Sequence, residues 1–546
     1  MTTLVNDGPR GGAADGHGAS RSGGTRHLAG TGTLLRLALR RDRVMMPVWI
    51  AITTVMVVSM PNTLKGVWPT AAERADIAAS MNTNGSMRAM YGPVFGDSLG
   101  ALTAWRAGTF AAVFAAIMSL LIVVRHTRDE EESGRQELVS SAMVGRRAPL
   151  TAALLTALVA NGVLALLVAG GLASQGGAGA LALGLAIGGC GMVFATMAAI
   201  VAQFTESARL ARGATSAVLG VAFVLRAAGD SGTNDGSSPL TWISPIGWVE
   251  NVRAFADERW WVLGLFLAAV LIQGVVGYEL AGRRDIGMSF LPTRPAPADG
   301  RLGTAGALAW RLQRGSVIGW SIGFLAAGVV FGGMTEGAAD LVGDSENTME
   351  IIERMGGHSG ITDAFLATMV GMLGMVAALY IVQAVLRLSG EETSQRAEPV
   401  LANAVGRTAW AGGHLVIAFA GAALIMLLGG VGLAVGHGHE FGAVIGACLV
   451  QLAAIWTLGG VAVLLYGLVP RAAVAAWAAA GAALLIGWIG PALKLPQAVM
   501  DVSPFGHLPK LPGGDMTWGP VLVEVVLAAV FVAVGLVGLR RRDMAG

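Results

Sequence analysis

The sequence predicts an all-α polytopic membrane protein of twelve transmembrane helices, arranged as a tandem 6+6 repeat with both termini in the cytoplasm. Of the 546 residues, 54% are hydrophobic and only 13% are charged, whereas charged residues make up about a quarter of an ordinary soluble domain. Twelve apolar windows are long enough to cross the roughly 30 Å hydrocarbon core of a bilayer. A densely charged loop also occurs twice, at equivalent places in the two halves of the chain.

The repeated loop is the segment 128–147, and its second copy is the segment 389–408. After a shift of 261 residues, nine of 17 positions match: Glu130 with Glu391, Glu131 with Glu392, Ser133 with Ser394, Arg135 with Arg396, Glu137 with Glu398, Val139 with Val400, Val144 with Val405, Gly145 with Gly406, and Arg146 with Arg407. A simple stop-transfer charge cluster would need only polar residues, but Glu, Arg and Glu recur here at i, i+4 and i+6. This spacing predicts a short helix with a charged face in each half, and hence two docking surfaces for two copies of one soluble partner.

The first half begins with a tail, residues 1–29, that is expected to be disordered in the cytoplasm because it is rich in Gly, Ser, Asp and Arg. The tail has no apolar run of the kind found in a secretory signal peptide. The segment 33–43 mixes leucine with arginine and is expected to lie at the inner membrane surface. The first transmembrane domain, residues 30–286, has predicted spans at 44–61, 107–125, 150–172, 179–203, 213–229 and 260–281.

A linker at residues 287–303, which contains three prolines, is expected to join the two halves in the cytoplasm. The second transmembrane domain, residues 304–546, has predicted spans at 316–333, 363–387, 410–434, 442–468, 472–490 and 519–539. With the amino terminus inside, 27 of the 37 Lys and Arg residues fall on the cytoplasmic side, as the positive-inside rule requires. The excess of Arg over Lys, with abundant Ala and Gly, is typical of a G+C-rich bacterial genome and indicates the bacterial inner membrane.

The outer loops 61–106 and 334–362 are too long to be simple turns, and we expect them to form small amphipathic helices. Two Ser-Pro-x-Gly turns, at 244–247 and 503–506, precede tryptophans. They are interpreted either as re-entrant or interfacial turns anchored by aromatic rings or as ordinary proline turns. Small residues spaced by four offer faces for close helix packing at Gly184 with Gly188 and at Gly328 with Gly332.

The sequence argues against several kinds of functional site. A nucleotide-binding P-loop needs Gly-Lys before Ser or Thr, and none of the three lysines, Lys65, Lys494 and Lys510, follows a glycine. Proton-coupled transport usually needs titratable groups deep in the membrane. The only ionisable residues clearly within a predicted span are Arg226, with Asp230 as its expected partner, and Glu524. The cysteines, Cys190 and Cys448, are interpreted as buried small residues in equivalent helices, and the sequence 437–440 as solvated loop residues that bind no metal.

In the loop after the second span, Glu130, Gly134, Glu137 and the adjoining Leu138 come close to the pattern Glu-x-x-x-Gly-x-x-Glu-x-Leu. This pattern resembles the coupling-helix signature of type-2 ATP-binding cassette (ABC) exporter permeases. The second copy keeps both acids but has Gln395 and Pro399 in place of Gly and Leu. The Arg-Arg-Asp ends at 283–285 and 541–543, together with the Ser-Pro-x-Gly turns, are similar to a fused twelve-span actinobacterial branch. That branch includes tetronasin and polyketide-antibiotic exporters and mycobacterial multidrug efflux permeases.

The resemblance implies an ATP-driven exporter of antibiotics, drugs or other lipophilic compounds, in which this chain is the transport subunit and not an enzyme. Two copies of a separate nucleotide-binding ATPase subunit carry the ATP and Mg, and the chain itself holds no cofactor. The implied coupling residues are Glu130, Glu131, Arg135, Glu137, Glu391, Glu392, Arg396 and Glu398. Replacing both Glu131 and Glu392 by Ala is expected to uncouple ATP hydrolysis from export. The fold should stay intact, because exposed loop charges contribute little stability.

Two other function classes stay open on the sequence alone. A proton-coupled 6+6 drug antiporter shares the duplicated architecture. A membrane scaffold or sensor without transport would use the repeated loops to recruit some other protein.

Overall fold

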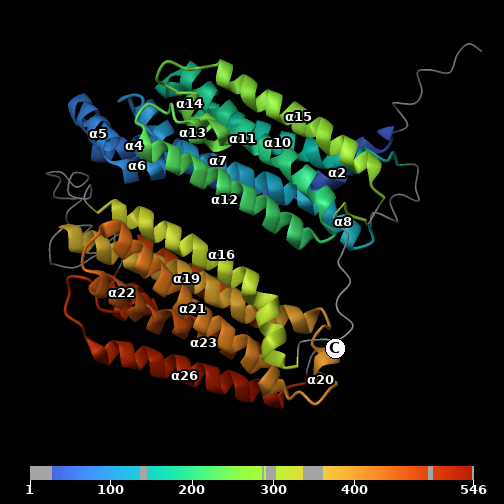
Figure 1. Cartoon of the computed structure of the whole chain (residues 1–546), viewed down its shortest axis with the longest axis vertical. Helices are drawn as coiled ribbons and strands as arrows, with labels where there is room; N and C mark the ends of the chain where they lie inside the picture. Colours follow the sequence, from blue (N-terminus) through green and yellow to red (C-terminus); the bar gives the residue numbers. More distant parts are fainter. Residues whose placement is uncertain are drawn as a thin grey trace, which may run out of the picture. The chain divides into compact units, whose positions relative to one another are not determined.

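The structure is a computed structural model that describes residues 27–135, 144–285, 288–290, 303–335, 361–489 and 496–543. All regular secondary structure in these ranges is helical. The chain divides into two compact units (Figure 1). Unit 1 consists of Met1–Gly66 and Tyr91–Thr293, and unit 2 consists of Val67–Met90 and Arg294–Gly546.

Unit 1 contains most of the helices of the first half of the chain. In chain order they are α2 (Thr31–Arg41), α3 (Met45–Val58), α4 (Met60–Val67), α7 (Leu99–Arg125), α8 (Arg128–Glu132), α10 (Ala148–Leu172), the 3-10 turn η1 (Ala173–Gln175), α11 (Gly177–Phe204), α12 (Ala208–Gly232), α13 (Pro239–Ile243), α14 (Pro245–Asn251) and α15 (Trp261–Arg283).

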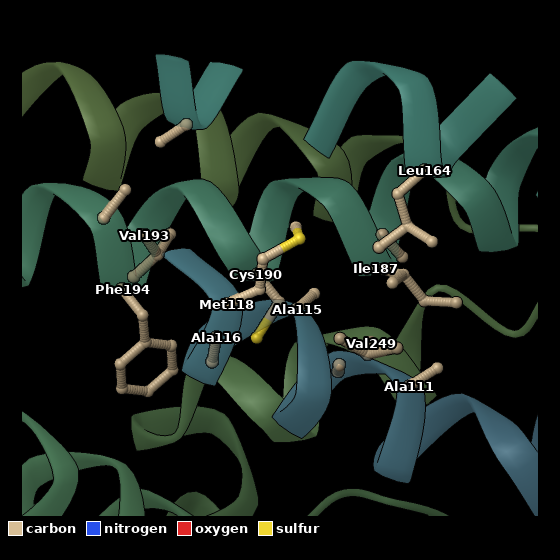
Figure 2. Packing of buried hydrophobic residues seen from close by; sticks show 14 of the residues in the cluster. Ala111, Ala115, Ala116, Met118, Leu164, Ile187, Cys190, Val193, Phe194 and Val249 are labelled. Carbon is tan, nitrogen blue, oxygen red and sulfur yellow. The ribbon is translucent and has the colours of Figure 1, made fainter. Parts of the chain in front are cut away.

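The core of unit 1 forms around α7 and α11, which pack against each other and are the most buried of its long helices. Their contact faces carry mainly alanine, glycine and other small residues, so the two backbones approach closely. Figure 2 shows this core, in which Cys190 of α11 lies beside Ala115 and Met118 of α7. Cys190 is a free, fully buried thiol, as the sequence predicts.

Unit 2 contains the short helices α5 (Ala71–Thr83) and α6 (Gly85–Tyr91), although the last residue of α6 belongs to unit 1. It also contains the helices of the second half. These are α16 (Ala305–Gly333), α19 (Ile361–Thr393), α20 (Glu398–Leu401), α21 (Arg407–His437), α22 (Phe441–Val450), α23 (Leu452–Leu468), the 3-10 turn η2 (Pro470–Ala472), α24 (Ala475–Ile489), α25 (Gln497–Met500), the 3-10 turn η3 (Pro504–His507) and α26 (Trp518–Arg541).

Glycines bring α16 and α21 into backbone contact in unit 2. A Cβ atom added to Gly328 would lie 2.3 Å from the carbonyl oxygen of Gly429, and one added to Gly432 would lie 2.3 Å from that of Leu325. Such distances are too short for any side chain, so only glycine fits at these crossings. The predicted packing faces at 184 and 328 are therefore confirmed, since a Cβ at Gly184 would lie 2.4 Å from the carbonyl oxygen of Ala165.

Eleven helices in the described ranges are long and apolar enough to cross a membrane. Each overlaps one of the predicted spans, and the span expected at 472–490 corresponds to the shorter apolar helix α24. Peripheral helices expose large apolar side chains, such as Leu267 and Val275 of α15, which are 61% and 65% exposed. Water would not tolerate so many exposed apolar side chains, but lipid does. The chain is a multi-pass membrane protein.

The loop at residues 61–106, which we expected on the outer side, contains short helices, as predicted. Its helix α5 begins with a capping box in which Thr70 and Glu73 exchange hydrogen bonds. The transmembrane helix α7 starts at Leu99, well before the predicted position 107, because the Ser98 hydroxyl accepts a hydrogen bond from the Ala101 amide and caps it there. Most of the second outer loop, residues 336–360, lies outside the described ranges.

Both Ser-Pro-x-Gly turns form the first turn of a short helix. In the first half, Ser244 caps α14 by accepting a hydrogen bond from the Ile246 amide at 3.2 Å, with Pro245 at the first helical position. Nearby, the rings of Trp242 and Trp261 stack with their centroids 5.4 Å apart. In the second half the turn forms η3.

Candidate functional site

The first charged loop starts with the short helix α8, directly after α7. Its residue Glu131 is only 6% exposed and forms a two-point ion pair with Arg284, with N–O distances of 2.7 and 3.0 Å. Arg128 adds a second ion pair to Glu131 at 2.6 Å and donates to the carbonyl oxygens of Ala202 and Met288. A carboxylate held by two guanidinium groups is a strong, geometrically specific anchor.

The neighbouring acids of this loop attach it to other helices of unit 1. Glu130 forms an ion pair with Arg41 of α2, and Asp129 forms one with Arg212 of α12 at 2.9 Å. Glu132 accepts a hydrogen bond from the backbone amide of Ala208, the first residue of α12. A carboxylate at that position also interacts favourably with the helix dipole.

The second charged loop follows the same plan in unit 2. Glu392 lies in the last turn of α19, is 5% exposed in its side chain, and receives two hydrogen bonds of 2.6 Å from Arg542. The Tyr466 hydroxyl donates a third at 2.6 Å. These hydrogen bonds with Glu392 raise the pKa of Arg542, so the guanidinium stays charged. Glu391 forms an ion pair with Arg387 at 2.8 Å.

A second contact from each loop completes the arrangement. Arg146 donates to the carbonyl oxygen of Arg284 at 2.8 Å, and its repeat mate Arg407 donates to the carbonyl oxygen of Arg542 at 2.6 Å. In each unit, the side chain of one arginine, Arg284 or Arg542, therefore binds a glutamate at the start of the loop. The carbonyl oxygen of the same arginine accepts a hydrogen bond from a second arginine at the end of the loop. We call these two arrangements the arginine clamps: Glu131, Arg284 and Arg146 in unit 1, and Glu392, Arg542 and Arg407 in unit 2.

The turn that follows each glutamate pair is also alike. Gly134 has φ +69° and its amide donates to the carbonyl oxygen of Glu131 at 3.0 Å. Its mate Gln395 has φ +57° and donates to the carbonyl oxygen of Glu392 at 2.9 Å. The left-handed conformation suits glycine and strains a residue with a Cβ atom. The second loop keeps the turn although it lacks the glycine.

The structure corrects one expectation about the predicted coupling residues. We expected Glu131 and Glu392 to be exposed, and this is wrong, because the clamps leave their side chains only 6% and 5% exposed. Glu391 is also buried. Arg135 and Arg396 are 56% and 65% exposed and lie 3.8 and 4.0 Å from Glu130 and Glu391 respectively. The remaining two are Glu398, which is exposed in the first turn of α20, and Glu137, which lies outside the described residues.

The expected short charged helix also differs between the two loops. In the first loop, Glu130 and Glu131 lie in α8 as predicted. In the second, Glu391 and Glu392 belong to the end of the long helix α19, and a separate short helix begins only at Glu398. The second loop therefore has no single short helix that carries all its charges.

Sequence reasoning missed the partners of the buried glutamates: Arg128, Arg284, Arg387, Tyr466 and Arg542. A signal was present for two of them, since Arg284 and Arg542 are the middle residues of the repeated Arg-Arg-Asp ends. Each lies about 150 residues beyond its glutamate, so nothing in local spacing joins the two motifs.

Comparison with known proteins bears on the whole chain. A family profile described as "Multidrug efflux system permease Rv1217c, C-terminal domain" matches residues 302–540. The chain is also 42% identical over 536 residues to the "Multidrug efflux system permease protein Rv1217c" of Mycobacterium tuberculosis, covering 95% of this chain and 96% of that protein. Identity at this level over nearly the full length of both proteins shows common descent, and the chain therefore belongs to the family of multidrug efflux system permeases that includes Rv1217c.

Proposed function

We propose that this chain is the membrane-spanning permease of an ATP-driven exporter that moves drugs, antibiotics or other lipophilic compounds out of the cell. The observation that carries the proposal is its 42% identity, over 95% of its length, to a multidrug efflux system permease. Two copies of a separate ATPase subunit, which bind the ATP and Mg, dock on the loops 128–147 and 389–408. Twelve spans in two repeated domains, 30–286 and 304–546, with both loops in the cytoplasm, complete the proposal.

The geometry of the loops supports a division of roles among the predicted coupling residues. The buried glutamates of the arginine clamps hold each loop on its own unit. The exposed Arg135, Arg396 and Glu398 are left to contact the partner. Arginine suits this role because its planar guanidinium group forms paired hydrogen bonds with a carboxylate of another protein.

The clamps also provide a route from each loop to a transmembrane helix. Arg284 follows the last residue of α15, and Arg542 follows the last residue of α26. A partner that displaces a loop therefore pulls on the end of the sixth or twelfth predicted span through a two-point ion pair. In this way the movement of the ATPase subunits, when they close, is transmitted to the transmembrane helices.

A charge-reversed variant tests the docking role directly. Arg135→Glu with Arg396→Glu reverses two exposed charges whose ion pairs contribute about 0–1 kcal/mol each. At roughly 2–4 °C per kcal/mol, the melting temperature of the chain should change by less than about 8 °C. The variant should lose co-purification with the ATPase subunit. Lys65→Glu reverses an exposed charge in a predicted outer loop and should keep co-purification. Equal co-purification of both variants would remove the docking role.

The function itself is tested by vanadate-sensitive ATP hydrolysis and drug export in membranes containing this chain, the co-expressed ATPase subunit, or both. Drug-stimulated hydrolysis and export only with both components are the expected results. Export that persists without the ATPase subunit and collapses with a protonophore would show a proton-coupled antiporter. Binding to a partner with neither hydrolysis nor export would show a scaffold or sensor.

A further inference from the structure

A cluster of charged residues lies buried in unit 1, away from the loops. Arg226 and Asp230 of α12 are both 0% exposed, and Glu250 of α14 is 8% exposed in its side chain. The sequence predicted the Arg226–Asp230 pair, which the structure places 3.5 Å apart, but not the shorter 3.0 Å contact of Arg226 with Glu250. The cluster therefore contains two carboxyl groups and one guanidinium group.

Hydroxyl groups of neighbouring helices orient both carboxyl groups. Thr109 of α7 donates to Oε1 of Glu250 at 2.7 Å, and Thr241 of α13 donates to Oδ1 of Asp230 at 2.7 Å. Both carboxyl groups also approach the same guanidinium nitrogen, Nη1 of Arg226.

The charge balance indicates that one of the two carboxyl groups is protonated. With both carboxyl groups ionised, the cluster would carry a net negative charge at a place with almost no access to water, which is costly. With one proton on the pair, Arg226 balances the remaining negative charge. Two carboxyl groups that share one guanidinium nitrogen favour this state, because the second ionisation works against the first.

Among the residues that the structure describes, the other ionisable groups near Glu250 have partners of their own. Arg253 and Tyr91 line a cavity beside Glu250. The Arg253 guanidinium stacks on Phe95 and donates to the Asp235 carbonyl oxygen, while Tyr91 lies under Arg106. The described neighbours of Glu250 on α7 and α11, Thr109 and Leu183, are uncharged. The cavity, about 30 Å³ in volume, exceeds the roughly 10–15 Å³ that one water needs, so it has room for a water beside Glu250.

We propose that Asp230 and Glu250 form a proton-binding site that holds one proton while α7, α12 and α14 pack as in this structure. The proton leaves the pair with a single negative charge, which Arg226 balances, and its loss leaves a buried net charge that pushes α12 and α14 apart. Conformations in which these helices separate therefore release the proton to water. The site does not depend on the energy source of export, so its test stands apart from that of the proposed function.

Infrared spectroscopy of the purified full chain tests the site, since the carbonyl stretch of a protonated carboxyl group is separate from that of a carboxylate. A protonated-carboxyl band is expected at neutral pH and should decrease at high pH. Glu250→Gln and Asp230→Asn should each remove this component, while Glu279→Gln, an exposed carboxylate of the same unit, should not. Glu524→Gln identifies any band from the buried Glu524 of unit 2. A neutral-pH band that is absent, or unchanged in both Glu250→Gln and Asp230→Asn, would overturn the proposal.

The pH dependence of stability is a second test that uses the wild type alone. Burial, and secondarily the charge of Asp230, raises the pKa of Glu250 well above its ordinary value of 4.5, although Arg226 opposes this. Between the ordinary and the raised value, the folded state binds one proton more than the unfolded state. Stability must therefore fall as pH rises, with the unfolding constant growing by up to about tenfold per pH unit. Glu250→Gln should flatten this slope, and a wild-type melting temperature that rises over the same range would contradict the site.

Discussion

Removing Glu392 tests whether the arginine clamp of unit 2 stabilises the fold. Glu392→Ala deletes the acceptor of two Arg542 hydrogen bonds and of the Tyr466 hydroxyl, each at 2.6 Å. The side chains of Glu392 and Arg542 are only 5% and 14% exposed, so solvent screens the pair little. Breaking a buried ion pair by removing one partner costs about 3–5 kcal/mol, because the other charge is left buried. At roughly 2–4 °C per kcal/mol, the melting temperature should fall by roughly 6–20 °C.

The assay is thermal unfolding of the purified chain, followed by intrinsic fluorescence. Glu398→Ala is the matched control, since it removes an exposed glutamate of the same loop and should change stability by less than about 0.5 kcal/mol. The double variant Glu392→Ala with Arg542→Ala should recover part of the loss, because it leaves no unpaired charge. A Glu392→Ala melting temperature within about 2 °C of the control would refute the clamp as a stabilising element.

Gln395→Gly should stabilise unit 2 by about 1 kcal/mol in thermal unfolding, because Gln395 has φ +57° and glycine adopts that conformation freely. Gly134→Ala should lose a similar amount in unit 1; a loss of stability in Gln395→Gly, or a gain in Gly134→Ala, would contradict the shared turn. Gly432→Ala should lower the melting temperature by several degrees, since its Cβ atom would lie 2.3 Å from the Leu325 carbonyl oxygen. Gly319→Ala in α16 meets nothing within 4 Å and should be neutral or stabilising; equal losses for both would mean that backbone contact does not limit packing.

Hydrophobic length predicted the transmembrane helices well. The span predicted at 179–203 is the helix Gly177–Phe204, and the span predicted at 442–468 is Phe441–Leu468. The bilayer requires every spanning backbone to satisfy its own hydrogen bonds, so an apolar run of this length can hardly be anything but a helix. Helix ends were less predictable, because caps such as Ser98 extend a helix beyond the apolar run.

The exposure of the charged loops could not be predicted in the same way. A cluster of glutamates and arginines between two spans is expected to be solvated, and for Arg135 and Arg396 this holds. Glu131 and Glu392 are buried only because an arginine from the end of the same unit reaches each of them. Whether a charged side chain faces water or pairs with another side chain depends on tertiary contacts, and the spacing of nearby residues in the sequence does not reveal them.

Because of the internal repeat, the two halves of this one sequence can be compared with each other. Glu131 and Glu392 recur, and so do Arg284 and Arg542; two motifs that are kept together in both halves are candidates for direct contact. The proton-binding pair has no such signal. The shift of 259 residues that aligns the Ser-Pro-x-Gly turns places Pro509 opposite Glu250, so the second half has no equivalent carboxyl group. Features shared by both units can be read from the duplication, whereas a feature that belongs to one unit requires the three-dimensional structure.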